Sequence, residues 1–166
     1  MSNVRIFVPG DASALSLGAG RVAEAVAREA QARGVAIELV RNGSRGLYWL
    51  EPMVEVEAAE GRIAYGPVSP SDVPSLFDAG FIRGGAHALR IGRPEDHPYL
   101  KKQQRLAFAR VGVVDPRSLD DYLATGGYRG LKAALGMTGE AVVEAVTRSG
   151  LRGRGGAAFP TGIKWR

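Results

Sequence analysis

A strand–helix–strand pattern near the start of the chain constrains its fold most strongly. Residues 4–8 are a short apolar run rich in β-branched side chains and ended by Pro9 and Gly10, which predicts a buried strand. Residues 18–33 place alanine and valine on one face and charges on the other, which predicts a helix. Residues 35–40 predict a second strand, and a right-handed crossover this short makes the two strands parallel neighbours.

An antiparallel hairpin and a second helix follow. Residues 53–58 and 62–68 alternate apolar and polar side chains on either side of a glycine, which predicts a hairpin with one solvent-exposed face. Ser71 or Asp72 is expected to cap the short helix that comes next. The resulting order, β-α-β-β-β-α, is the core order of a thioredoxin-like α/β domain, which we assign to residues 1–82.

The chain contains no cysteine. This excludes disulfides, a thiol nucleophile, a CxxC redox pair and any iron–sulfur cluster held by cysteines of these residues. His87 and His97 cannot complete a zinc site by themselves, so no metal site is expected. Without redox cysteines, the thioredoxin-like domain is expected to serve as a scaffold or a docking module.

The middle of the chain is expected to connect two modules. Residues 83–98 are rich in glycine and proline and predict an extended linker. Residues 99–149 predict a mainly helical lead-in to whatever follows. Its helices are expected at residues 99–110, after a cap at Ser118, at residues 128–135 and at residues 138–149.

Composition and charge narrow the class of protein. With 45% hydrophobic and 23% charged residues, the chain has the composition of a folded globular protein. No run approaches the roughly 18 apolar residues that span a membrane, and Pro9 and Asp11 interrupt any secretory signal, so a soluble, cytoplasmic protein is expected. The net charge of +5 lies entirely beyond Glu144, the last acidic residue, which argues against a nucleic-acid-binding face spread over the molecule.

A glycine-rich segment, residues 150–166, is the part of the sequence that indicates chemistry. Its glycines allow backbone N–H groups to approach a ligand, two cations without nearby acids suit a phosphate, and an aromatic ring can lie along a flavin. The residues concerned are Gly153, Arg154, Gly155, Gly156, Phe159 and Lys164. A purely structural glycine turn and a disordered Arg-Gly segment that binds RNA are the alternatives.

Residues 149–165, SGLRGRGGAAFPTGIKW, resemble the flavin-site loop of the NADH-binding flavoprotein subunit of respiratory complex I and its soluble relatives. Residues 115–122, DPRSLDDY, and the helices that follow them resemble the lead-in of the same subunits. The cysteine-free N-terminal part, including residues 40–46 and 49–52, is most similar to the beta, or diaphorase, subunit of NAD-dependent molybdenum formate dehydrogenases. The diaphorase subunit of NAD-reducing hydrogenases is the nearest alternative.

The resemblance implies an oxidoreductase subunit in a cytoplasmic formate dehydrogenase complex. Electrons from formate, oxidised on a molybdenum-containing alpha subunit, would pass through iron–sulfur clusters to FMN and then as hydride to NAD, with a small iron–sulfur gamma subunit as a further partner. No side chain is expected to act as a catalytic acid or base. Carried over by position, the FMN site comprises Gly153, Arg154, Gly155, Gly156, Ala157, Phe159, Gly162 and Lys164.

Two features depart from the family pattern. Ala158 stands where many relatives have glycine, and its methyl group would narrow the approach to the flavin. Relatives also continue beyond this point through the rest of the flavin-binding domain, of which residues 150–166 would be the start, a ubiquitin-like domain and a helical region whose cysteines hold a 4Fe-4S cluster. The 166 residues alone are therefore expected to bind FMN weakly or not at all and to lack diaphorase activity, with a docking role as the alternative.

Overall fold

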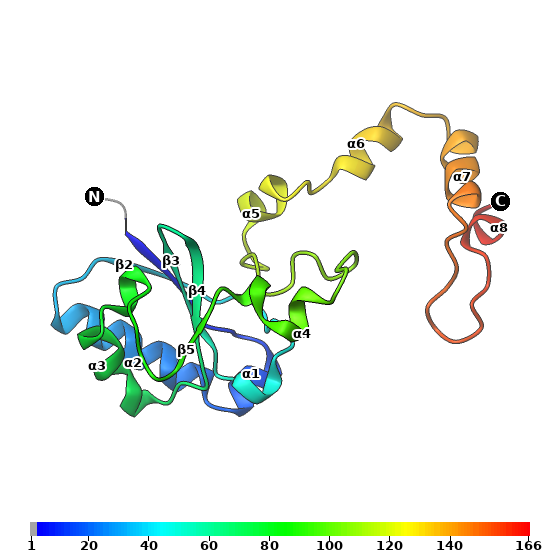
Figure 1. Ribbon diagram of the computed structural model, residues 1–166. Helices are drawn as coiled ribbons and strands as arrows, with labels where there is room; N and C mark the ends of the chain where they lie inside the picture. Colours follow the sequence, from blue (N-terminus) through cyan, green and yellow to red (C-terminus); the bar gives the residue numbers. More distant parts are fainter. Residues whose placement is uncertain (1–2) are drawn as a thin grey trace. The chain divides into compact units, whose positions relative to one another are not determined.

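The computed structural model describes residues 3–166, which form two compact units. The first unit ends at Asp121 and the second is Tyr122–Arg166. The first unit therefore extends well beyond residue 82, where the thioredoxin-like domain was expected to end. Figure 1 shows the sheet in the first unit and short helices joined by loops in the second.

The first unit is built on one five-stranded sheet with the strand order β2-β1-β3-β4-β5 (Figure 1). Its strands are β1 (Val4–Phe7), β2 (Ile37–Val40), β3 (Val54–Ala58), β4 (Gly61–Tyr65) and β5 (Arg90–Gly92). β1 and β2 are parallel, with Val4 opposite Ile37, and the other neighbouring pairs are antiparallel. The order of strands and helices confirms the expected β-α-β-β-β-α core and thus the thioredoxin-like arrangement.

The first three helices of this unit pack on one face of the sheet, where their apolar side chains meet those of the strands, and the fourth packs through Leu100 against Ala64 on the other face. The first unit contains α1 (Ala12–Ser16), α2 (Ala19–Ala32), α3 (Val73–Asp78) and α4 (Pro98–Lys101). Val22 and Val26 of α2 lie in the same buried cluster as Ile6 of β1 and Phe77 of α3. After α2 the chain turns at Gly34 with a φ of 65°, the left-handed conformation expected there.

A capping box precedes the short helix α3, and Asp72, one of the two caps expected from the sequence, is the N-cap residue of α3. The Ser69 backbone N–H donates to the Asp72 carboxylate at 2.8 Å, and the two residues form a capping box ahead of the helix. Ser69 is the N-cap of the 3-10 turn Pro70–Asp72. Asp72 occupies the third position of the box and is also the N-cap residue of α3, although its side chain makes no capping hydrogen bond to that helix.

The opposite face of the sheet differs from the solvent-exposed face expected for the hairpin. Glu55, on β3, is only 1% exposed, because arginines and the backbone of residues 112–113 cover it. The alternation of apolar and acidic side chains is correct, but Glu55 is buried, whereas Glu57 on the same face is exposed. Alternation reveals which side chains share a face and does not reveal what a distant segment places over them.

Part of the expected linker belongs to the sheet. Within residues 83–98, β5 pairs with β4, with Arg90 opposite Tyr65. The phenol of Tyr65 also donates to the carbonyl oxygen of Gly85 at 2.7 Å. A three-residue strand flanked by glycine and proline leaves no periodicity to detect, which is why the sequence pattern indicates a linker.

The expected helix over residues 99–110 is wrong beyond its first turn. α4 ends at Lys101, and Leu100 is its buried residue, packed with Leu47, Met53 and Ala64. Leu106 and Phe108, which complete the apolar stripe, are 91% and 64% exposed. A stripe that covers no apolar surface adds little to a short helix, whose stability depends on tertiary packing.

The second unit consists of short helices, of which all but the last, α8, lie at the expected places. α5 (Leu119–Ala124) spans the boundary between the units and is followed by α6 (Arg129–Leu135), α7 (Gly139–Arg148) and α8 (Thr161–Trp165). The Ser118 hydroxyl accepts from the N–H of Asp121 at 3.1 Å, which confirms the expected cap. Among the described residues of both units, no helix combines the length and apolarity needed to cross a membrane.

Candidate functional site

The glycine-rich segment forms a closed loop with a defined base. An isolated antiparallel bridge joins Arg152 and Pro160. The N–H of Gly153 donates to the carbonyl oxygen of Phe159 at 2.9 Å, and the guanidinium of Arg152 donates to that of Ala158 at 2.7 Å. These bonds join the two ends of the loop, so residues 154–157 form a closed turn between them.

Two glycines of this loop are not required by the conformation of the chain itself. A Cβ on Gly155 would meet no atom within 4 Å, and one on Gly153 would make only ordinary contacts at 3.7 Å with Phe159. Neither residue has the positive φ that demands glycine, whereas Gly156 has a φ of 123°. The described chain therefore leaves space beside the backbone of Gly153 and Gly155.

The loop backbone has free hydrogen-bonding capacity. In residues 154–158 of the described structure, no amide N–H donates to a protein acceptor. Ala158 has a φ of 48°, in the left-handed region, two positions after Gly156, whose φ is also positive. The N–H groups of residues 154–158 are thus available to an acceptor outside the described chain.

The residues expected to bind FMN are distributed over the loop and the helix after it. Phe159 is 54% exposed, and the side chains of Arg154 and Lys164 are also exposed. No acidic residue follows Glu144, so neither cation has a nearby carboxylate in sequence. The loop holds Gly153, Arg154, Gly155, Gly156, Ala157 and Phe159, and α8 holds Gly162 and Lys164.

Gly162 has a packing role. It is buried where α8 lies against α7, and a Cβ there would collide with both the backbone and the side chain of Thr147. The Thr147 hydroxyl donates to the carbonyl oxygen of Val143 at 2.8 Å, so that side chain cannot easily move aside. Gly162 thus sets how closely α8, which carries Lys164, approaches α7.

A buried ionic cluster in the first unit is absent from the sequence-based expectations. Arg45 binds Glu55 through two hydrogen bonds, from Nε to Oε1 at 2.8 Å and from Nη2 to Oε2 at 2.7 Å, and both side chains are almost fully buried. Arg62 lies 3.4 Å from the same carboxylate and stacks 3.4 Å from the centre of the Phe7 ring. Paired guanidinium groups compensate the buried charge of Glu55.

This cluster holds a distant segment of the first unit against the sheet. Arg62 donates to the carbonyl oxygens of Gly112 at 3.1 Å and Val113 at 2.6 Å, and Asn42 Nδ2 donates to Gly112 at 2.7 Å. The sequence offers two signals for the ionic cluster. Arg45 lies in the loop 40–46, and Arg62 lies on a strand pair that contains Glu55 and Glu57. Neither identifies residues 112–113 as the covering segment.

Glu51 is a second buried carboxylate in the same unit. It accepts from the Ser44 hydroxyl at 2.7 Å and from the Met53 N–H at 2.8 Å. Burial raises the pKa of Glu51 above its ordinary value, and the bonds from Ser44 and Met53 only partly oppose this effect.

Comparison with known proteins relates part of the chain to redox enzymes. It is 62% identical over 65 residues to the NADP-reducing hydrogenase protein HndC of Solidesulfovibrio fructosivorans, covering 39% of this chain and 13% of that protein. It is 55% identical over 49 residues to an NADH-quinone oxidoreductase subunit of Aquifex aeolicus, covering 30% and 12%, and 40% identical over 76 residues to the equivalent protein of Escherichia coli, covering 45% and 16%. Part of this chain is homologous to subunits of NADH- and NADP-linked oxidoreductases.

The chain spans less than a fifth of the length of these relatives. No family model matches it. Among solved structures, the thioredoxin-like [2Fe-2S] ferredoxin from Aquifex aeolicus aligns with a TM-score of 0.45 and 20% identity, over 56% of this chain and 100% of that one. The thioredoxin-like arrangement of the first unit is assigned from its own strand order, and the cysteine-free sequence provides no cysteine ligand for such a cluster.

Proposed function

We propose that this chain is the N-terminal part of the NAD-reducing flavoprotein, or diaphorase, subunit of a multi-subunit oxidoreductase, and that residues 150–166 begin its FMN-binding domain. The observation that carries the proposal is the open backbone at Gly153 and Gly155, where nothing in the described chain requires glycine. The homology to NADH- and NADP-linked subunits supports the same conclusion independently.

Each part of the loop has a distinct task in this proposal. The N–H groups around Gly155 and Gly156 would hold the FMN phosphate, Arg154 and Lys164 would offset its charge, and Phe159 would lie along the ring system. FMN, when bound, supplies the hydride chemistry toward NAD. The protein's contribution is alignment of the two rings, so no catalytic acid or base is needed.

We further propose that the upstream substrate is formate. The support is the resemblance of residues 40–46 and 49–52 to the diaphorase subunit of molybdenum formate dehydrogenases. The partners would then be a molybdenum-containing alpha subunit and a small iron–sulfur gamma subunit, with a 4Fe-4S cluster held by cysteines beyond these residues. The second candidate, an NAD(P)-reducing hydrogenase, is favoured by the 62% identity to HndC.

The flavin proposal is tested with two matched glycine substitutions in the full-length protein. Gly155→Ala adds a methyl group where the chain itself leaves open space, and Gly130→Ala does the same on α6, outside the loop. We expect Gly155→Ala to weaken FMN binding by about tenfold or more, because the methyl group blocks the phosphate, and Gly130→Ala to leave it unchanged. Equal flavin content in both variants, with unchanged circular dichroism, would contradict the proposed site.

The choice of substrate is tested on the purified native complex. We expect formate, and not hydrogen, to reduce NAD, and metal analysis to find molybdenum without nickel. Hydrogen-dependent reduction with nickel present would assign the chain to the hydrogenase group instead. A complex without flavin would refute the enzyme proposal as a whole and leave the docking role.

A further inference from the structure

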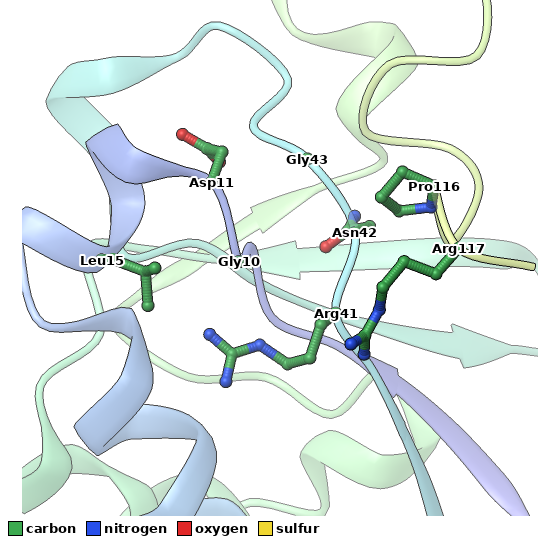
Figure 2. A pocket seen from close by; sticks show the side chains of 8 residues that line it. All are labelled: Gly10, Asp11, Leu15, Arg41, Asn42, Gly43, Pro116 and Arg117. Atoms are coloured by element: carbon green, nitrogen blue, oxygen red, sulfur yellow. The ribbon is translucent and has the colours of Figure 1, made fainter.

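A pocket in the first unit lies at the carboxyl ends of the parallel strands β1 and β2. It has a volume of about 430 Å³, within the range of small-molecule sites. In open α/β sheets, ligands commonly bind beyond the carboxyl ends of the strands. Figure 2 shows the residues that line it: Gly10, Asp11, Leu15, Arg41, Asn42, Gly43, Pro116 and Arg117.

Asn42 supplies an unused hydrogen-bond acceptor to this pocket. The residue is 2% exposed, and its Nδ2 donates to the carbonyl oxygen of Gly112 at 2.7 Å, which fixes the orientation of the amide. Its Oδ1 is buried and accepts from no donor in the described part of the chain. Figure 2 shows this oxygen turned into the pocket. A buried acceptor of this kind needs a donor, which a bound molecule or an ordered water supplies.

The charged residues of the pocket favour an anion. Arg41 is anchored by bonds from Nε to the carbonyl oxygen of Val8 and from Nη2 to that of Pro9, both at 3.0 Å, which leave Nη1 available. The exposed guanidinium of Arg117 has no partner among the described residues. The opposing carboxylate of Asp11 is occupied: it accepts from the N–H groups of Ser13, Ala14 and Ser44.

We propose that this pocket binds a small phosphorylated molecule that carries a hydroxyl or amino group. Arg41 and Arg117 would bind the phosphate, since guanidinium groups match its geometry, and Asn42 Oδ1 would accept from the hydroxyl or amine. Leu15 and Pro116 provide apolar walls for the carbon skeleton. The pocket is built from the first unit only and does not include the glycine loop, so the proposal does not depend on the flavin site.

The proposal is tested by calorimetric titration of the full-length chain with glycerol 3-phosphate. Inorganic phosphate lacks the hydroxyl, glycerol lacks the phosphate, and glycerate carries a carboxylate in its place. We expect glycerol 3-phosphate to bind about tenfold more tightly than inorganic phosphate, and the other two to bind weakly or not at all. Arg117→Gln should weaken binding of glycerol 3-phosphate about tenfold, whereas Arg28→Gln, an equal change of charge on the exposed side of α2, should not.

Asn42→Ala should bring glycerol 3-phosphate and inorganic phosphate to equal affinity, because the acceptor for the hydroxyl is lost. Should that variant fail to fold, the selectivity of the unmodified protein and the pair Arg117→Gln and Arg28→Gln still decide the matter. The proposal is overturned if no probe binds and a crystal structure shows only a water at Asn42 Oδ1. Equal affinity for glycerate, or equal losses in both arginine variants, would also overturn it.

Discussion

At the scale of single residues, Glu51 makes stability depend on pH. Because burial raises its pKa, the folded protein retains a proton that the unfolded chain releases between the two pKa values. The stabilisation is complete below the ordinary glutamate pKa of about 4.3 and is lost as pH rises through the raised value. We expect the free energy of unfolding to decline over that interval.

Glu51→Gln should remove this decline. The amide can donate to the Ser44 hydroxyl and accept from the Met53 N–H, so both contacts survive without a titrating group. Urea denaturation followed from about pH 4 to about pH 7 gives the slope. The exposed Glu60→Gln serves as the control and should keep the slope of the unmodified protein. A similar slope in Glu51→Gln would show that another group is responsible.

Ala158 is a second residue whose conformation makes a prediction. Its φ of 48° costs an L-residue about 1–2 kcal/mol, and a β-branched side chain tolerates it least. If the loop holds the FMN phosphate, Ala158→Val should weaken FMN binding by the full-length protein about tenfold, and Ala158→Gly should bind at least as tightly as the unmodified protein. Flavin fluorescence titration measures both. Unchanged binding in Ala158→Val would show that the loop conformation does not matter for the cofactor.

At the scale of elements, the ionic cluster decides how residues 112–113 are held on the sheet. Glu55→Gln leaves the buried Arg45 with only the half-exposed Glu95 as a charge partner and should destabilise the first unit by about 3 kcal/mol. Glu57→Gln, two positions along β3, breaks only the exposed pair with Arg5 and should cost about 1 kcal/mol or less. Urea denaturation compares the two variants, and similar losses would contradict a special role for the buried pair.

Local signals explain which elements could be predicted. The caps at Ser118 and Gly34 act within one turn of their helices, so residue type alone indicates where those helices begin or end. β5 and the early end of α4 depend on partners far along the chain. The same limit explains why Glu55 was expected to be exposed, since the covering carbonyl oxygens lie more than 50 positions later.

The two candidate sites also differ in how far the sequence alone could predict them. The glycine loop is contiguous, so its residues could be predicted as a group from composition and spacing. The pocket beyond β1 and β2 is lined by Asp11, Asn42 and Arg117, which come from three separate segments. Only the parallel pairing of β1 and β2 and the segment around residues 112–117 bring these residues together. Asn42 within a loop of turn residues looks like an ordinary turn asparagine, and its buried amide oxygen is visible only in the fold.

At the scale of the whole molecule, the two units differ in how much they bury. Among the described residues, every buried hydrophobic side chain belongs to the first unit, and the second unit buries only Gly127 and Gly162. A unit without a buried apolar core opens readily, because little free energy opposes local unfolding. Helices α6 to α8 therefore need a covering surface that these residues do not supply.

Hydrogen–deuterium exchange followed by mass spectrometry tests this difference. In the 166-residue chain, we expect amides of β1 and β3 to exchange slowly and those of residues 129–165 to exchange close to the unfolded rate. If residues 150–166 begin a flavin-binding domain, as proposed, peptides from α7 and α8 should become protected in a protein that contains the whole domain, because its remainder would bury exposed residues such as Ile163 and Trp165. Equal protection of α7 and α8 in both proteins would mean that these helices are stable without a cover. The glycine loop between them would then be held in place by its own bridge alone.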